Sequence, residues 1–271
     1  MWNKEKKAPV AEYLIWVVVI WVIVFAVSGT LKEYSVLYME SGNITWQYIV
    51  YAIIGMLFTT PAPMLALFIT LRHCEGITVK EYFKRFFYTE NKLLTVAVTG
   101  GFCLLALLFA LVNGVPNGTP WYMMPLGFLV MIPFVGFAEE TGWRGLLQPA
   151  MEEKTGFIAG TVITAVIWCV WHVDLWFDPT SNHYGDNFIG FGINIVIWSF
   201  AFAAIYKSTG SVIACAVYHA FIDSIGAIYD WNLLFDSFPG DIVVNLYRLI
   251  ILIVSFVLWI YSDRREKKNL A

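Results

Sequence analysis

The sequence predicts an all-α polytopic membrane protein, a bundle of about eight transmembrane helices with an intramembrane polar cavity. Of its 271 residues, 59% are hydrophobic and only 14% are charged, whereas soluble domains carry about 25% charged residues. Apolar stretches of about 20 residues recur along the chain, which is the length that a helix needs to cross a bilayer. The predicted helices use nearly all of the chain, so we expect a single transmembrane domain over residues 1–271.

The predicted spans follow the apolar stretches in order. They lie near residues 10–28, 47–71, 93–112, 123–147, 157–176, 188–206, 211–229 and 243–262. Proline removes a helical hydrogen bond, so Pro61 and Pro63 should kink the second span and Pro133 the fourth. We expect a catalytic core over about 123–229, with flanking helices in 10–112 and 243–262.

The basic residues predict the orientation of the bundle. Cytoplasmic loops carry an excess of Lys and Arg, and 14 of the 17 Lys and Arg residues fall on one set of loops, which places both termini in the cytosol. These residues are Lys4, Lys6, Lys7, Arg72, Lys80, Lys84, Arg85, Lys92, Lys154, Lys207, Arg264, Arg265, Lys267 and Lys268. The compact chain favours a prokaryotic plasma membrane, or the endoplasmic reticulum if the source is eukaryotic. The basic, aromatic segment 79–88 should lie flat on the cytosolic leaflet.

Several other polar or reactive residues are expected to be structural. The cysteines Cys74, Cys103, Cys169 and Cys215 form no C-x-x-C pair, so they should pack as small apolar residues rather than bind metal or form disulfides. His73 and His183 lie in loops beside polar residues, where we expect solvated side chains without a role. Asn194, inside the sixth span, should bridge two helices.

Two adjacent glutamates and an arginine lie in the fourth span. A charged side chain near the bilayer centre costs a few kcal/mol or more, so such residues indicate function. Glu140 and Arg144 are spaced i,i+4 and can pair on one helix face. Glu139 points about 100° away from that face and has no partner on its own helix, which makes it the better candidate for a general base.

Three more ionisable residues are embedded in later spans. His172 ends the apolar run of the fifth span, and His219 precedes Asp223 by four residues in the seventh, so that the last two share a helical face. Glu139 and His172 are equally distant from the predicted turn near 154–156, which puts them at one height in an antiparallel hairpin. His219 reaches that height only if the turn carrying Lys207 lies deeper in the membrane.

Three chemistries fit a carboxylate, two histidines and a second carboxylate in one cavity. In hydrolysis, Glu139 and His172 would deprotonate a water molecule while His219 stabilises the oxyanion. Alternatively, His172, His219 and a carboxylate could hold a catalytic zinc ion, although no H-E-x-x-H motif is present. A relay of Glu, His and Asp could instead transport protons or ions.

The three motifs resemble those of the CAAX-protease and bacteriocin-processing family of intramembrane proteases, related to the type II CAAX prenyl endopeptidase. They are Glu139-Glu140-x-x-x-Arg144, an aromatic-x-x-x-His from Trp168 to His172, and His219-x-x-x-Asp223. The resemblance implies that Glu139 and His172 activate water and that His219 and Asp223 form the oxyanion side, with Glu140 and Arg144 in support. Two positions depart from the pattern: Trp168 replaces the usual Phe, a change that we expect to be minor, and Asp223 replaces the Asn of eukaryotic-type enzymes.

The resemblance also bears on Asp223, cofactors and partners. An ionised Asp cannot donate a hydrogen bond, so Asp223 is either protonated, orients His219 or helps to bind a metal. We favour a water activated by Glu139 without a cofactor; the alternative is zinc held by His172, His219, Glu139 and Asp223.

The implied substrate is a membrane-bound protein or peptide, isoprenylated in the CAAX case. The implied partners also include membrane lipid, and they include no nucleic acid. The alternative functions are a non-catalytic bacteriocin self-immunity protein and a proton or ion transporter.

Overall fold

The computed structural model describes residues 8–178, 180–181, 183–230 and 241–270. Over these residues the chain is mostly helical, and it contains one antiparallel pair of two-residue strands. Lys4, Lys6 and Lys7, which contributed to the predicted orientation, lie outside the described residues. The predicted all-α polytopic class is therefore confirmed.

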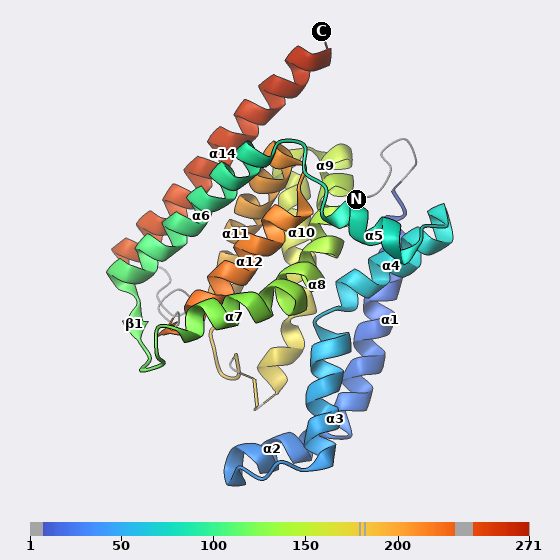
Figure 1. Cartoon of the computed structure of the whole chain (residues 1–271), viewed down its shortest axis with the longest axis vertical. Helices are drawn as coiled ribbons and strands as arrows, with labels where there is room; N and C mark the ends of the chain where they lie inside the picture. Colours follow the sequence, from blue (N-terminus) through green and yellow to red (C-terminus); the bar gives the residue numbers. More distant parts are fainter. Residues whose placement is uncertain (1–7, 179, 182, 231–240, 271) are drawn as a thin grey trace.

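The N-terminal helices form one side of the molecule (Figure 1). They are α1 (Val10–Gly29), α2 (Lys32–Ser41), α3 (Trp46–Ile54), the π-helical turn η1 (Gly55–Thr59) and α4 (Ala62–Glu75). The second predicted span is bent by 52° between α3–η1 and α4, which is the break that Pro61 and Pro63 predict. After this break α4 packs against α1.

The middle of the chain begins with a short amphipathic helix and ends with an irregular one. The elements are α5 (Val79–Phe86), α6 (Lys92–Asn113), β1 (Val115–Pro116), α7 (Met123–Met131), η2 (Ile132–Phe137), α8 (Ala138–Gly142), η3 (Trp143–Leu147) and α9 (Gln148–Thr155). Thr78 and Glu81 form a capping box that fixes the start of α5. The run from α7 to α9 is continuous over Met123–Thr155, but the π-helical turns η2 and η3 lie on either side of α8.

The remaining elements are α10 (Phe157–Trp171), the 3₁₀ turn η4 (Val173–Phe177), α11 (Phe188–Thr209), α12 (Val212–Gly226), β2 (Tyr229–Asp230) and α14 (Ile242–Leu270). Helix α11 packs against α10, α12 and α14 at the centre of the bundle, and α6 lies beside α14 along one edge (Figure 1). Arg248 on α14 donates from Nε to Asn194 Oδ1 on α11 at 3.1 Å. Asn194 therefore bridges two helices, as predicted.

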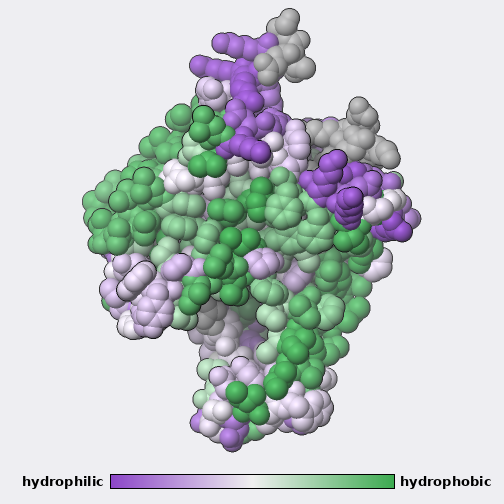
Figure 2. Space-filling model, in the orientation of Figure 1, coloured by the Kyte–Doolittle hydropathy of each residue, from purple (hydrophilic) through white to green (hydrophobic). Residues whose placement is uncertain are grey.

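The predicted number of eight spans is not confirmed. Six helices among the described residues are long and apolar enough to cross a membrane, and seven if the bent pair is one span. The predicted span over 211–229 is the shorter helix α12, because Ser211 caps its start and the helix ends at Gly226. A broad apolar area covers the middle of the face seen in Figure 2, between more hydrophilic ends, as a membrane location requires.

Close backbone packing holds α8 in place. A Cβ atom at Gly136 would overlap the backbone of Ala216 on α12, and one at Gly142 would overlap Tyr13 and Pro63 from α1 and α4. Two glycines thus let α12 on one side and α1 with α4 on the other approach the segment that carries Glu139 and Glu140.

Candidate active site

A cavity of about 790 Å³ opens between α7–α8, α10, α11 and α12. Its lining includes four of the predicted site residues, namely Glu139, His172, His219 and Asp223. They come from three separate helical segments, so the fold brings together residues that are up to 84 positions apart by their numbers (223 − 139). Glu140 and Arg144 do not line the cavity; they lie directly behind it.

Glu139 is held by a residue from another helix. Its side chain is only 3% exposed, and its Oε2 accepts a hydrogen bond of 2.7 Å from Trp168 Nε1 on α10. A phenylalanine could not donate this bond. The departure at Trp168 therefore adds a contact that the sequence did not predict, because the indole N–H holds the candidate base. The bond engages one carboxylate oxygen and leaves Oε1 for another partner.

Glu140 forms the buried centre of a charge network. Arg144 Nη1 lies 3.1 Å from both of its carboxylate oxygens, and His219 Nδ1 lies 2.8 Å from Oε1. Arg144 also donates from Nη2 to Ser199 Oγ on α11 at 3.2 Å. The predicted i,i+4 pair is present, and it ties α8 to α11 and α12.

The guanidinium of Arg144 is also enclosed by aromatic rings. Its Cζ lies 4.3 Å from the ring centroid of Phe202 and 4.8 Å from that of Trp168. Cation–π contacts of this kind stabilise a charge that is removed from water. Glu140 and Arg144 are both fully buried, so their charges are neutralised within the protein rather than by solvent.

One hydrogen bond of His172 determines which of its ring nitrogens can act as a base. Its Nδ1 lies 2.8 Å from the backbone carbonyl oxygen of Trp168. A carbonyl oxygen can only accept, so Nδ1 carries the proton. In the neutral imidazole, Nε2 then keeps its lone pair and can accept a proton or a hydrogen bond.

His219 lies between two carboxylates. Its Nδ1 contacts the buried Glu140, and its Nε2 lies 3.8 Å from Asp223 Oδ2, one turn along α12. The side chain of Asp223 is 36% exposed, so this carboxylate faces the open part of the cavity. The distance of 3.8 Å is beyond a direct hydrogen bond, and it leaves room for a polar group between the two side chains.

The sequence missed part of the cavity wall. His183, expected to be solvated, lines the cavity with Asp186, and its Nδ1 lies 3.0 Å from Asp186 Oδ2. Its ring stacks on Trp176 with 5.1 Å between centroids. Two residues that precede α11, His183 and Asp186, therefore border the cavity, and no helical spacing in the sequence indicates this.

The fit of a catalytic metal can be tested on the donor atoms. Among the described residues, no three donors drawn from Glu139, His172, His219 and Asp223 lie within 4.8 Å of one another. Moreover, His219 Nδ1 is engaged by Glu140 and Glu139 Oε2 by Trp168. These residues do not form a metal site as they are arranged here, so we derive no step through a metal.

The comparison with protein families agrees with the motifs. Residues 119–225 match the family model described as type II CAAX prenyl endopeptidase Rce1-like. This region of the chain is therefore similar to the Rce1-like family. The match confirms the resemblance predicted from the motifs, and it includes every candidate site residue from Glu139 to Asp223. No curated protein matches the chain. The family match implies a protease of the CAAX type that acts within the membrane.

Proposed function

We propose that this protein is an intramembrane endopeptidase that cleaves a peptide bond with a water molecule activated by Glu139 and His172. The observation that carries the proposal is the convergence of Glu139, His172, His219 and Asp223 on one cavity inside a bundle of apolar helices. Each of these groups has a hydrogen bond or ion pair that orients it, as acid–base catalysis requires.

The proposed reaction uses Glu139 and His172, each of which keeps an acceptor atom available for water. Water donates one hydrogen bond to Glu139 Oε1 and another to His172 Nε2. Glu139 takes a proton from the water while the water oxygen attacks the carbonyl carbon of the substrate, and the carbonyl oxygen becomes an oxyanion. The protonated Glu139 then delivers its proton to the departing amine, so that the peptide bond breaks and Glu139 is regenerated.

His219 is placed to stabilise the oxyanion. The carboxylate of Glu140 accepts a hydrogen bond from His219 Nδ1–H. His219 can therefore donate from Nε2 only when both nitrogens of its ring carry a proton. Carboxylates that face both nitrogens, at 2.8 and 3.8 Å, support this positive charge. In this proposal Asp223 orients His219 and balances its charge, and the oxyanion approaches Nε2. Preorganised donors of this kind contribute about 2.7–4 kcal/mol each to catalysis.

The proposed substrate is a membrane-bound protein or peptide, with an isoprenylated CAAX protein as the first class to test. Apolar side chains from several helices, among them Met131, Val135 and Ile222, line the cavity beside the polar groups. An extended peptide with a lipid anchor would find apolar contacts and the reactive groups in the same space. Membrane lipid surrounds the outer faces of the bundle.

The test is cleavage by the purified protein in liposomes, with prenylated and unprenylated forms of one fluorogenic peptide. Glu139→Gln keeps the size of the side chain and removes the base, so we expect at least about a 10²-fold loss of kcat. Glu153→Gln, an exposed glutamate on α9, is the matched control and should cleave normally. Undiminished cleavage by Glu139→Gln would end the proposal.

The same variant separates the alternative functions. A transporter would carry protons or ions across liposomes without breaking a peptide bond, and Glu139→Gln would abolish that flux. A non-catalytic immunity protein would protect cells from a bacteriocin even with Glu139→Gln. Loss of peptide cleavage alone, without any flux in the wild type, supports the protease.

We also propose that both termini face the cytosol and that the protein resides in a plasma membrane. The excess of basic residues on one set of loops supports this orientation. A cysteine introduced at Gly118 should then react with an impermeant label from outside the cell, and one at Lys207 only after the membrane is opened. Labelling of position 207 from outside would reverse the orientation. Asn182, another candidate position on the outer side, lies outside the described residues.

A further inference from the structure

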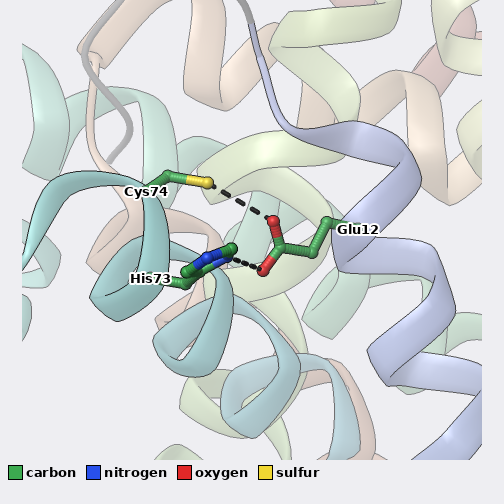
Figure 3. A group of neighbouring side chains, drawn as sticks. All are labelled: Glu12, His73 and Cys74. Atoms are coloured by element: carbon green, nitrogen blue, oxygen red, sulfur yellow. Dashed lines mark hydrogen bonds and ion pairs between the residues drawn. The ribbon is translucent and has the colours of Figure 1, made fainter.

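Three side chains of metal-binding type meet where α1 begins and α4 ends, away from the cavity. Figure 3 shows His73 and Cys74 on α4 pointing toward Glu12 on α1. His73 Nδ1 lies 2.9 Å from Glu12 Oε1, and Cys74 Sγ donates to Glu12 Oε2 at 3.4 Å. One donor atom from each residue lies within 4.8 Å of the other two.

Helix packing holds these side chains together. The cluster joins the first turn of α1 to the last turn of α4. Gly76, in the left-handed conformation with φ of 69°, ends α4 directly after Glu75, so His73 and Cys74 are fixed on the last turn. Beside Glu12, Tyr13 is fully buried in the same hydrophobic core as Leu67 and Leu71 of α4. The two helices therefore keep the three donors close without needing a ligand.

The three side chains of the cluster are of the types that bind Zn²⁺ in proteins. A thiolate, an imidazole and a carboxylate are the three ligand types that Zn²⁺ uses in proteins, and harder cations such as Mg²⁺ and Ca²⁺ prefer oxygen alone. Zinc bonds of about 2.0–2.3 Å in a tetrahedron place neighbouring donors about 3.3–3.8 Å apart. The two contacts to Glu12, at 2.9 and 3.4 Å, need only small side-chain shifts to reach that spacing.

The arginine next to the cluster in the chain is bound by backbone oxygens rather than by Glu12. Arg72 precedes His73 in the chain, but its guanidinium donates to the backbone oxygens of Gly76 and Ile77. The side chain of His73 is 76% exposed and that of Glu12 is 29% exposed. Solvent can therefore reach the cluster and supply a fourth ligand.

We propose that Glu12, His73 and Cys74 form a Zn²⁺ site that ties α1 to α4. On binding, the Cys74 thiol loses its proton to solvent, and the carboxylate, the thiolate and the neutral imidazole each give one ligand, with water in the fourth position. The site does not depend on the proposed peptidase activity, because none of its residues lines the cavity. Cys74 is exposed rather than packed as an apolar residue, and His73 is exposed as predicted; the proposal gives both residues a role that the sequence did not predict.

The test uses the full-length protein in detergent, stripped with a chelator and titrated with Co²⁺ as a spectroscopic substitute for zinc. We expect one equivalent of Co²⁺ to give the charge-transfer absorption of a cobalt–thiolate bond, and Zn²⁺ to abolish it by displacement. Cys74→Ser should lose this absorption, while Cys103→Ser, a matched change on α6, should keep it. Zn²⁺ should also raise the Tm of Cys103→Ser but not that of Cys74→Ser.

A second variant keeps the test decisive if Cys74→Ser does not fold. His73→Gln changes an exposed side chain and leaves the thiol in place, and we expect it to weaken Co²⁺ binding at least tenfold. Folded wild-type protein without a cobalt–thiolate absorption, or equal affinity in wild type and His73→Gln, would overturn the site and leave only a hydrogen-bonded contact. Glu139→Gln should bind Co²⁺ like the wild type whether or not the protein proves to be a peptidase.

Discussion

The bond from Trp168 to Glu139 gives the sharpest prediction about catalysis. Trp168→Phe removes the Nε1–H that donates to Glu139 Oε2 at 2.7 Å and keeps an aromatic ring against Arg144. A hydrogen bond to a charged group contributes about 1.5–3 kcal/mol. At 1.36 kcal/mol for each factor of ten in rate, full loss of that contribution from the transition state lowers kcat by about 10- to 100-fold.

The effect should fall on kcat more than on KM, because Trp168 donates its hydrogen bond to the proposed base. The assay is steady-state cleavage of the fluorogenic peptide in liposomes, with the Tm of each variant measured in parallel. Trp171→Phe is the matched control: it removes an indole N–H which, among the described residues, has no hydrogen-bond partner, and it should lower kcat by much less.

Trp168→Phe introduces the residue type that the family usually has at this position. A loss of kcat would show that this chain depends on the indole N–H. A folded Trp168→Phe protein with wild-type kcat would refute the argument and would mean that Glu139 is oriented without the indole.

Three further predictions test the surroundings of the site. Arg144→Met should lower the free energy of unfolding by about 3–5 kcal/mol, since it removes the guanidinium that pairs with the buried Glu140. The double variant with Glu140→Gln should recover part of that loss in denaturation experiments. Gly136→Ala should destabilise the protein by about 1–3 kcal/mol and reduce cleavage, because its methyl group would overlap Ala216, whereas Gly100→Ala meets nothing within 4 Å and should be tolerated. Burial alone would raise the pKa of Asp178, but hydrogen bonds from Thr180 and Tyr51 and the charge of Lys32 hold this pKa below 3.8. The ionised Asp178 therefore contributes its full stabilisation above pH 3.8, and this stabilisation is lost as the pH falls through the lower pKa of the folded protein. Asp178→Asn should lack this contribution at every pH.

The sequence predicted those parts of the structure that depend on local spacing. Helix α11 begins at the first residue of the predicted span 188–206, after the Asn187 cap, and ends three residues beyond it at Thr209. The pair of Glu140 and Arg144 follows from the i,i+4 geometry of one helix. Residues 119–225, which match the Rce1-like family model, overlap the predicted core over 123–229, whose bounds stay a prediction.

Contacts between distant segments could not be predicted in this way. Trp168 reaches Glu139 across 29 residues, and His73 reaches Glu12 across 61. Neither separation is a helical period, so no pattern in one segment indicates the other. The predicted number of eight spans is not confirmed, because hydropathy measures only how apolar a segment is. It does not show that α12, although apolar, is too short to count as a full span.

The π-helical turns η2 and η3 on either side of α8 bear on how this protein can evolve. A π-helical turn holds one residue more than the α-helix around it needs, and each residue turns the helix by about 100°. Deleting a single residue from η2 would rotate Glu139 relative to α7 and the cavity wall, and deleting one from η3 would turn Arg144 away from Glu140. Substitutions should therefore accumulate in this helix far more readily than insertions or deletions. Functional homologues should align through residues 132–147 without gaps, even where few of their side chains agree.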